Sequence, residues 1–355
     1  MTQFFQFFVT GLARGSVFAI VGLGLVIVFK ATHLLNFAHG ALMTIGAYLC
    51  YEFHNGWKWN TWLGLILVLF GAFAALDRSR PKFVIPGAAM LAAGLYVMLG
   101  IHLDYKWKLP YVISILLAMI VTGGLGLIID IVLLRRMRGR PVFSIIMVTF
   151  GIAIIADQYV PSRWGSEAVN INDPIGIKST RILGVPVTLI DVVTFLVAMG
   201  VTVAFLQFFK RSRLGTAMRA TAYDQEAAIA QGISAKMVFG VSWFISAALA
   251  ALAGILLVSG GGRTLDSTVG FFALAAFPAI ILGGIDSTTG AIVGGMVLGI
   301  AEQLSVGYEN QSVFGFVPSD YVGQNFHVVL PYIVMVIILL VRPYGFFGTK
   351  EVRRV

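Results

Sequence analysis

Long runs of apolar residues, separated by short polar stretches, follow one another along almost the whole chain. Eleven of these runs have lengths near those of membrane-spanning helices: 5–29, 34–53, 61–76, 83–101, 111–134, 142–160, 188–209, 238–259, 271–284, 289–306 and 328–342. The run at 271–284 is short and ends in LGGID, which is typical of a broken or re-entrant helix. The pattern predicts an all-α, polytopic bundle of about ten to eleven membrane segments, forming a single domain over residues 1–355.

The positions of the basic residues orient these segments. If the N-terminus lies outside, the inside loops carry 17 Lys and Arg residues and the outside loops carry 7. The large basic clusters, RRMRGR at 135–140 and KRSRLG at 210–215, then fall on the same side. The positive-inside rule therefore predicts an outside N-terminus and an inside C-terminus. The net charge of +9 follows from this placement and gives no reason to expect a nucleic-acid partner.

Composition agrees with a membrane protein. The chain is 58% hydrophobic and only 12% charged, about half the charged fraction of a soluble domain. Its single cysteine, Cys50, excludes an intrachain disulfide. The sequence contains no GxxxxGK[ST], HExxH, CxxC or GxSxG motif, and so no candidate site for ATP phosphates, a metal or a covalent catalyst. We therefore expect a transport subunit rather than an enzyme, with no cofactor bound by this chain.

Three loops stand out for their length. Outside, 161–187 is rich in proline and 307–327 has no Lys or Arg, and each fits either a protein-docking surface or a plain connector. Inside, the longest loop, 210–237, contains YDQEAAIAQGI. As a helix, this stretch is amphipathic and too short to span, with Asp224 and Glu226 near its start and Gly232 at its end. Composition alone fits a solvated connecting helix.

Several collinear motifs are more specific than composition. HLLNFAHGALMTIGAY begins at His33, Glu226-Ala227-Ala228 is followed after three residues by Gly232, and AIILGGIDSTTGAIVGGMVLGIAEQL and VRPYGFFGTKEVRRV close the chain. Together they closely resemble the NFAHG segment, the EAA-x3-G loop and the C-terminal stretches of branched-chain amino-acid ABC importer permeases. Residues 57–109 look longer than in typical members, which suggests an extra helix pair within 54–110.

The resemblance implies a function and a set of partners. Such a permease lies in the bacterial plasma (inner) membrane and passes a small solute inward by alternating access. The partners implied are a second homologous permease, two cytoplasmic ABC ATPases that hold ATP and Mg, an extracytoplasmic solute-binding protein and membrane lipid. Branched-chain or other hydrophobic amino acids are the expected solutes, with urea and short amides as alternatives. The ATPase-coupling residues implied are Tyr223, Asp224, Glu226, Ala227, Ala228 and Gly232.

Polar residues inside the membrane are costly and mark candidate pathway positions. Asn36 and His39 share one face of the expected second helix, and Gly40 and Thr44 continue it at four-residue spacing. This stripe fits either a translocation path or tight helix packing through small residues. Glu302 and Gln303 are further candidates for a polar cavity, whereas Arg14 is expected to extend outward and Asp130 to pair locally with Arg135.

Two further readings come from the same residues. Gly290, Gly294, Gly295 and Gly299 form overlapping small-xxx-small pairs, which predict a helix-contact face within this chain or toward a second permease. The alternative function is an autonomous, ion-coupled secondary transporter or channel. That class predicts paired acidic residues at mid-membrane and no docking helix, and Glu302 is its main support.

Overall fold

The computed structural model describes residues 2–58, 106–176, 178–182, 185–260, 263–308 and 326–348. The chain forms two compact units. The larger comprises Met1–Tyr48 and Ala118–Val355, and the smaller comprises Leu49–Leu117. Most of the expected helix pair within 54–110 lies outside the described residues, so that pair stays a prediction.

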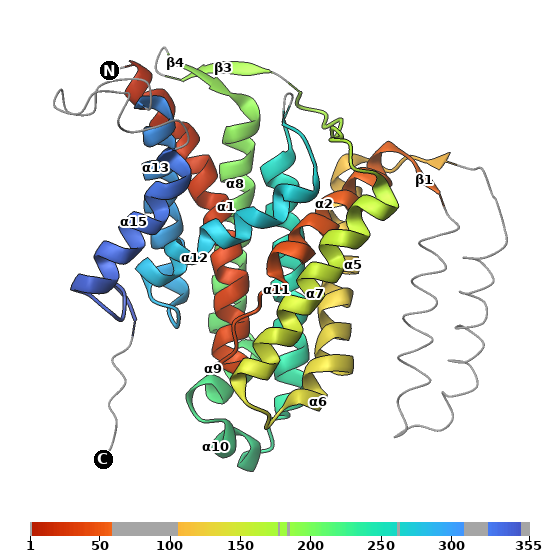
Figure 1. Cartoon of the computed structure of the whole chain (residues 1–355), viewed down its shortest axis with the longest axis vertical. Helices are drawn as coiled ribbons and strands as arrows, with labels where there is room; N and C mark the ends of the chain where they lie inside the picture. Colours follow the sequence, from red (N-terminus) through yellow and green to blue (C-terminus); the bar gives the residue numbers. More distant parts are fainter. Residues whose placement is uncertain are drawn as a thin grey trace. The chain divides into compact units, whose positions relative to one another are not determined.

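Helices make up most of the described secondary structure (Figure 1). They are α1 (Thr2–Thr32), α2 (His39–Asn55), α5 (Tyr111–Ile129), η2 (Asp130–Leu134), α6 (Arg135–Met137), α7 (Val142–Trp164), α8 (Leu189–Arg211), α9 (Arg213–Tyr223), α10 (Gln225–Ala230), α11 (Ala235–Val258), η3 (Ser267–Gly270), α12 (Phe271–Gly283), α13 (Thr288–Tyr308) and α15 (Phe326–Val341). The short strands form two antiparallel pairs. β1 (Trp57–Lys58) pairs with β2 (Lys106–Trp107), and β3 (Ser179–Ile182) pairs with β4 (Val185–Thr188).

In the smaller unit, the end of α2 is fixed to the segment that leads into α5. The amide of Leu109 donates to the carbonyl of Phe53 (3.0 Å), and Nδ1 of His54 lies 3.0 Å from the carbonyl oxygen of Leu109. The His54 ring also meets Tyr111 edge-on, with 5.3 Å between ring centroids. These contacts continue the pairing of the two chain segments beyond the β1–β2 pair.

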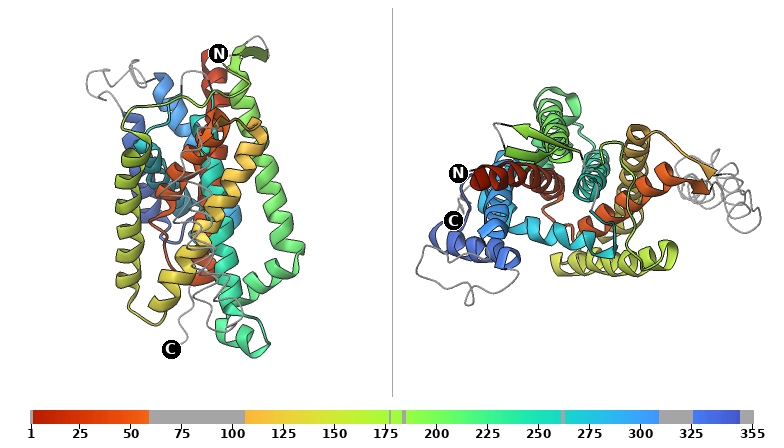
Figure 2. Two further views of the ribbon diagram at one scale, coloured as in Figure 1. Left: turned by 90° about the vertical axis from the view of Figure 1, so that its right-hand side faces the viewer. Right: turned by 90° about the horizontal axis from the view of Figure 1, so that it is seen from above.

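The larger unit is built around α1. This helix contacts α8, α11, α12 and α13 and is buried throughout its middle, from Phe18 to Val28 (Figures 1 and 2). The most apolar stretch of α1 is 83% buried and that of α11 is 72% buried, whereas that of α7 is only 17% buried. The apolar side chains left exposed on α7 therefore face lipid or another membrane chain.

The two ends of the larger unit differ in charge. The basic clusters at 135–140 and 210–219 lie around α6, α9 and α10 at one end (Figure 1). The start of α1 and the β3–β4 pair lie at the opposite end. This arrangement is the one that the predicted orientation requires, with α10 inside and the N-terminus outside.

The predicted polytopic helical membrane fold is confirmed. Six described helices are long and apolar enough to cross a membrane. The expected segments at 61–76 and 83–101 lie outside the described residues, and each of the other nine overlaps a helix, with ends that differ by at most five residues. The 13-residue α12 is about 20 Å long, shorter than the hydrocarbon core, as expected for a broken helix.

The expected start of the second helix at residue 34 is wrong. α1 ends at Thr32, the next residue His33 has a left-handed φ of 54°, and α2 begins only at His39. The hydroxyl of Thr32 donates to the carbonyl of Val28 (2.7 Å) and accepts from the amide of Leu34 (3.3 Å). These local bonds compete with continued helix, so residues 33–38 form a non-helical connection.

The outer loop 161–187 is fastened to the segment after α11. Val169 and Leu265 form an isolated antiparallel bridge, and Oδ2 of Asp173 accepts from the amide of Gly260 (2.9 Å). A docking role for this loop stays a prediction. Most of the second outer loop, 307–327, lies outside the described residues.

Candidate coupling and translocation sites

The inside loop 210–237 folds into two short helices. α9 begins after Ser212, whose hydroxyl accepts from the amide of Gly215 (2.8 Å). Arg219 donates to the carbonyls of Phe209 and Lys210 at the end of α8, and its guanidinium lies over the Phe209 ring. These contacts fix α9 to the end of a membrane-spanning helix.

α10 is a separate helix that is capped at both ends. Asp224 has an extended backbone, and its Oδ1 accepts from the amide of Ala227 (3.0 Å). At the other end Gly232 has a φ of +83°, and the amides of Gly232 and Ile233 donate to the carbonyls of Ile229 (2.9 Å) and Ala228 (3.0 Å). This is a Schellman C-cap, in which glycine takes the left-handed position without Cβ strain.

The expectation of one helix over the whole of YDQEAAIAQGI is therefore wrong. Tyr223 is the last residue of α9, and Asp224 lies between the helices. An aspartate that accepts an amide hydrogen bond favours this N-cap position over a helix interior. Glu226 in the first turn and Gly232 at the final turn lie where the sequence placed them.

The surface of α10 is open. Of its apolar residues only Ala228 is buried, and Ile229 is half exposed; Tyr223, which ends α9 just before it, is almost fully exposed. Asp224, Glu226 and Ala227 are also exposed. A short capped helix that presents apolar and acidic side chains beyond the membrane is suited to contact with another protein.

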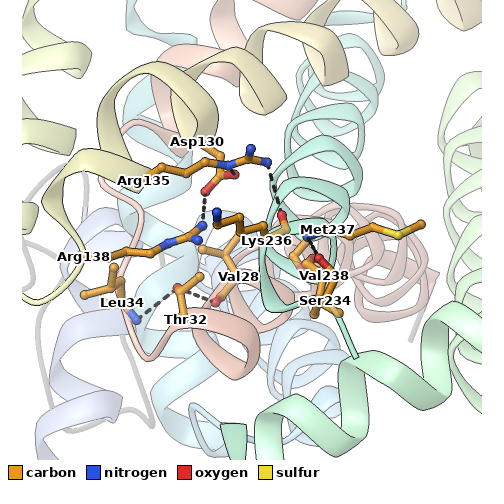
Figure 3. A network of polar contacts seen from close by, with 11 residues as sticks. Val28, Thr32, Leu34, Asp130, Arg135, Arg138, Ser234, Lys236, Met237 and Val238 are labelled. Atoms are coloured by element: carbon orange, nitrogen blue, oxygen red, sulfur yellow. Dashed lines mark hydrogen bonds and ion pairs between the residues drawn. The ribbon is translucent and has the colours of Figure 1, made fainter. Parts of the chain in front are cut away.

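A buried carboxylate lies close to the end of this loop (Figure 3). Oδ2 of Asp130 accepts from Nε of Arg135, and Oδ1 accepts from Nη2 of Arg138, both at 3.0 Å. Arg135 also donates to the carbonyl of Lys236 in the first turn of α11 (3.2 Å), and the Arg138 guanidinium lies 4.3 Å from the Phe239 ring centroid. The network ties α6 to α11, the helix that follows α10.

The local geometry makes room for this network. Asp130 begins the π-helical turn η2, which is wider than an α-helical turn. Gly240 of α11 lies opposite, where a Cβ would come 3.3 Å from Nη2 of Arg135. Burial lowers the pKa of Arg138, and the charge of Asp130 opposes that shift. The sequence predicted the Asp130–Arg135 pair, whereas Arg138 and α11 join it only through tertiary packing.

Three of the predicted pathway residues line one cavity of about 90 Å³, here called the central cavity: Asn36, His39 and Gly40. Asp157 of α7 and the aromatic residues Phe37, Phe150 and Phe277 also line it. The expected helical face is wrong for Asn36, which precedes α2. Its Oδ1 accepts from the amide of Ala38 (3.0 Å), and its buried Nδ2 has no hydrogen-bond partner.

His39 and Thr44 show how closely this region packs. Nδ1 of His39 lies 3.3 Å from the Ser246 hydroxyl of α11, and a Cβ on Gly24 of α1 would come 2.6 Å from Cε1 of His39. Thr44 donates to the carbonyl of Gly40 in its own helix (3.2 Å). The residues expected to form a polar stripe thus combine a cavity wall with close helix packing.

Glu302 and Gln303 lie in a different place, in the outer part of α13. Glu302 Oε1 and Arg14 Nη2 form an ion pair of 2.8 Å, and the Arg14 guanidinium lies 5.1 Å from the Phe272 ring centroid. The expectation that Arg14 extends outward is therefore wrong. Gln303 and Arg14 line a second cavity of about 110 Å³, here called the outer cavity.

A second ion pair borders the outer cavity. Oδ1 of Asp191 in α8 lies 2.5 Å from Nη2 of Arg263, and both residues line the cavity with Thr194. Sequence reasoning missed Asp191 and Arg263. The sequence did contain one signal, because Asp191 is a carboxylate in the first turn of an apolar run. Membrane proteins seldom place a carboxylate in such a run without a partner.

The four glycines of the predicted contact face pack α13 against helices of this chain. A Cβ at Gly295 would come 2.6 Å from the amide nitrogen of Ala19 in α1, and a Cβ at Gly299 would clash with Gly15. Gly290 and Gly294 make equally close approaches to the backbone of α12. These positions therefore set the spacing of α13 from α1 and α12.

The part of the chain that the structure describes contains no group of three or more His, Cys, Asp or Glu side chains that could hold a metal ion. The charged clusters instead pair arginine with carboxylate. These pairs can bind charged groups and hold helices together, and none of them places a nucleophile beside a general base.

Comparisons with known proteins agree over nearly the whole chain. The family model described as "Branched-chain amino acid transport system / permease component" matches residues 7–76 and 79–339. The high-affinity branched-chain amino acid transport system permease protein LivH of Salmonella typhimurium is 29% identical over 357 residues, covering 99% of this chain and 98% of LivH.

Two further relatives are similar over comparable spans. The permease protein BraD of Pseudomonas aeruginosa, from a high-affinity branched-chain amino acid transport system, is 29% identical over 362 residues, covering 99% of this chain and 98% of BraD. A probable branched-chain amino acid transport permease protein LivH of Methanocaldococcus jannaschii is 28% identical over 337 residues, covering 94% and 90%. No solved structure matches the chain.

Proposed function

The chain belongs to the family of branched-chain amino acid transport permease components, and from this membership we propose that it is the translocating membrane subunit of an ABC importer. It is a multi-pass permease of the bacterial inner membrane and not an enzyme. The family match over nearly the full length is the observation that carries the proposal. Its substrates are branched-chain or similar hydrophobic amino acids, as the names of the relatives suggest.

The proposed coupling element is α10 with its two caps. The Asp224 cap and the Gly232 turn hold it as a rigid unit between α9 and α11. A force applied to α10 passes on one side through the Arg219 contacts to α8, and on the other side to the start of α11. The exposed residues Tyr223, Glu226 and Ile229 support docking of an ATP-hydrolysing partner on this surface.

The proposed pathway passes the central cavity. Asn36 and Asp157 offer polar groups there, and Phe37, Phe150 and Phe277 offer an apolar wall. This mixture suits a small solute with a polar end and an aliphatic end. Movement of α11 against α1 and α2 would change the cavity, because His39 lies between Gly24 and Ser246.

The remaining partners belong to the same proposal. Two cytoplasmic ATPases hold ATP and Mg, a second homologous permease completes the membrane part, and an extracytoplasmic binding protein delivers the solute. The weakly buried α7 supports a further membrane chain, since it leaves many apolar side chains uncovered.

The test is co-purification with the ATPases. The chain, the second permease and the ATPases are co-expressed and purified in detergent through a tag on this chain. Glu226→Lys reverses a charge on α10, and Glu167→Lys makes the same change at an exposed position of the outer loop. We expect both variants to fold and only Glu226→Lys to lose the ATPases. Equal recovery of ATPase with both variants would contradict docking on α10.

A further inference from the structure

The outer cavity contains more hydrogen-bonding capacity than the chain uses. Nε of Arg14, Oε2 of Glu302 and the Thr194 hydroxyl are all buried and have no hydrogen-bond partner. Arg14 and Thr194 line the cavity directly, and Glu302 forms the ion pair with Arg14. Buried polar groups are nearly always paired in proteins, so a cluster of unpaired ones indicates a missing ligand or water.

The charges around this cavity are arranged asymmetrically. In the Arg14–Glu302 pair the arginine side chain is 34% exposed and the carboxylate 7%. In the Arg263–Asp191 pair the values are 42% and 5%. In both pairs the carboxylate is the more buried partner, so the guanidinium groups have the larger accessible surface, and Asp191 lines the cavity already paired with Arg263. A site of this kind favours an anion, because guanidinium groups bind carboxylate oxygens through several donors at once.

Part of the remaining cavity wall is apolar, while Thr10 and Gln303 add two further polar side chains. Val17 of α1 and Leu256 and Leu257 of α11 line it beside the arginines. A cavity of about 110 Å³ is smaller than most pockets that enclose a whole ligand, which measure roughly 300 Å³ or more. It suits the charged end of a small molecule whose aliphatic part extends along these apolar residues.

We propose that the outer cavity is a carboxylate-binding site that receives the α-carboxylate of the transported amino acid. Arg14 and Arg263 approach the carboxylate from α1 and from the segment after α11, and the Thr194 hydroxyl donates the remaining hydrogen bond. The proposal rests on the proposed function, which makes a small amino acid the solute. It adds a specificity rule: the solute needs a free carboxylate.

The location of the cavity fits this role. It is formed by the first half of α1, the first two turns of α8 and the last turn of α11, which meet at the end of the bundle opposite α10 (Figure 1). In the predicted orientation this is the outer side. A solute released there meets the outer cavity at the entrance to the membrane.

A matched pair of variants on one helix isolates the site. Thr194 and Thr202 of α8 are both buried, and both have a hydroxyl without a partner, but only Thr194 lines the outer cavity. Replacing either by valine removes a hydroxyl and leaves no donor behind. Thr194→Val and Thr202→Val are therefore expected to fold alike and to differ only in ligand binding.

The readout is stabilisation of the purified full-length permease in detergent by leucine, with leucinamide as the probe that lacks a carboxylate. We expect leucine to raise the unfolding temperature of the wild type and of Thr202→Val. Thr194→Val should need roughly fivefold more leucine for the same rise, as for one lost hydrogen bond. Leucinamide should have little effect on any of them.

Exchanging the charges of Arg14 and Glu302 tests whether this ion pair takes part in solute binding or only stabilises the structure. Arg14→Glu combined with Glu302→Arg keeps the pair but places the carboxylate at the cavity, so leucine should no longer stabilise the protein. The proposal is overturned if leucine stabilises the exchanged variant and the wild type equally, if Thr194→Val matches Thr202→Val, or if leucine leaves the wild type unchanged. ATP-driven uptake by the whole importer is measured separately, so failure of the site and failure of the proposed function give different results.

Discussion

Arg14 of α1 and Glu302 of α13 are 288 positions apart in the sequence and form an ion pair of 2.8 Å. Glycines on both helices allow it, because Gly299 lies against the backbone of Gly15 and a Cβ at Gly11 would come 2.8 Å from Cα of Ile300. Charge pairing and close backbone packing thus support one another at this helix contact. Small residues at helix contacts have this effect in membranes, where apolar burial alone does not hold helices together.

The first prediction concerns this packing. Gly299→Ala places a methyl group against the backbone of Gly15, which cannot move aside as a side chain can. We expect a loss of about 1–3 kcal/mol in the free energy of unfolding, seen as a lower unfolding temperature in detergent. Gly200→Ala in α8 is the control, since no atom lies within 4 Å of its added Cβ. Equal stability of the two variants would show that α1 and α13 do not pack this closely.

The second prediction concerns the Asp130 network. Asp130→Asn leaves two arginines facing a neutral group, and both are about 30% exposed and can reach water. We therefore expect a moderate loss of about 1–3 kcal/mol. ATP hydrolysis by the assembled importer should also become less dependent on solute, because Arg135 and Arg138, which contact α11, lose the carboxylate that orients them. Arg136→Gln changes an exposed charge nearby and should alter neither quantity.

The third prediction concerns the end of α10. Gly232 has a left-handed φ of +83° with open space around it, so only backbone strain opposes a side chain there. Gly232→Val should weaken ATPase binding, because the left-handed backbone conformation costs an L-amino acid about 1–2 kcal/mol. A β-branched side chain such as valine raises that cost further. Gly232→Asn should retain most of the binding, since asparagine tolerates this conformation. Titrating the ATPase onto the purified permease measures both, and a weaker complex with asparagine than with valine would contradict the explanation.

The fourth prediction separates two roles of Asn36. Its Oδ1 caps the turn before α2, whereas its Nδ2 is unpaired at the central cavity. N36D keeps the capping oxygen and removes the donor, while Asn36→Ala removes both. If the donor serves the solute, both variants should reduce uptake roughly fivefold with ATPase binding intact. Normal uptake by N36D together with reduced uptake by Asn36→Ala would assign Asn36 to the turn alone.

Helix positions were largely predictable from the sequence. A membrane-spanning helix satisfies its backbone hydrogen bonds internally, so its apolar run marks it without knowledge of its neighbours. The exceptions are helix ends that are set by short polar side chains. Thr32 and Asp224 form local hydrogen bonds that stop α1 and divide α9 from α10, and apolar periodicity does not detect such bonds.

The candidate sites were predictable only in part. Gly232 and Glu226 have roles set by local backbone geometry, and the sequence placed both. The ion pairs of Arg14 and of Asp191 with Arg263 form only because particular helices meet in the fold. A single sequence does not say which helices meet, so these pairs could not be predicted from it. The six expected pathway residues proved to lie in separate regions, with Asn36 at the central cavity and Gln303 at the outer one.

The most direct test of the importer function is leucine uptake into sealed vesicles that contain the two permeases and the ATPases. The binding protein is added on the side of the N-terminus and ATP on the side of α10. For an ABC importer we expect uptake that needs ATP and the binding protein together and that Glu226→Lys abolishes. Accumulation of leucine by this chain alone, driven by a proton or sodium gradient without ATP, would contradict it and establish a secondary transporter.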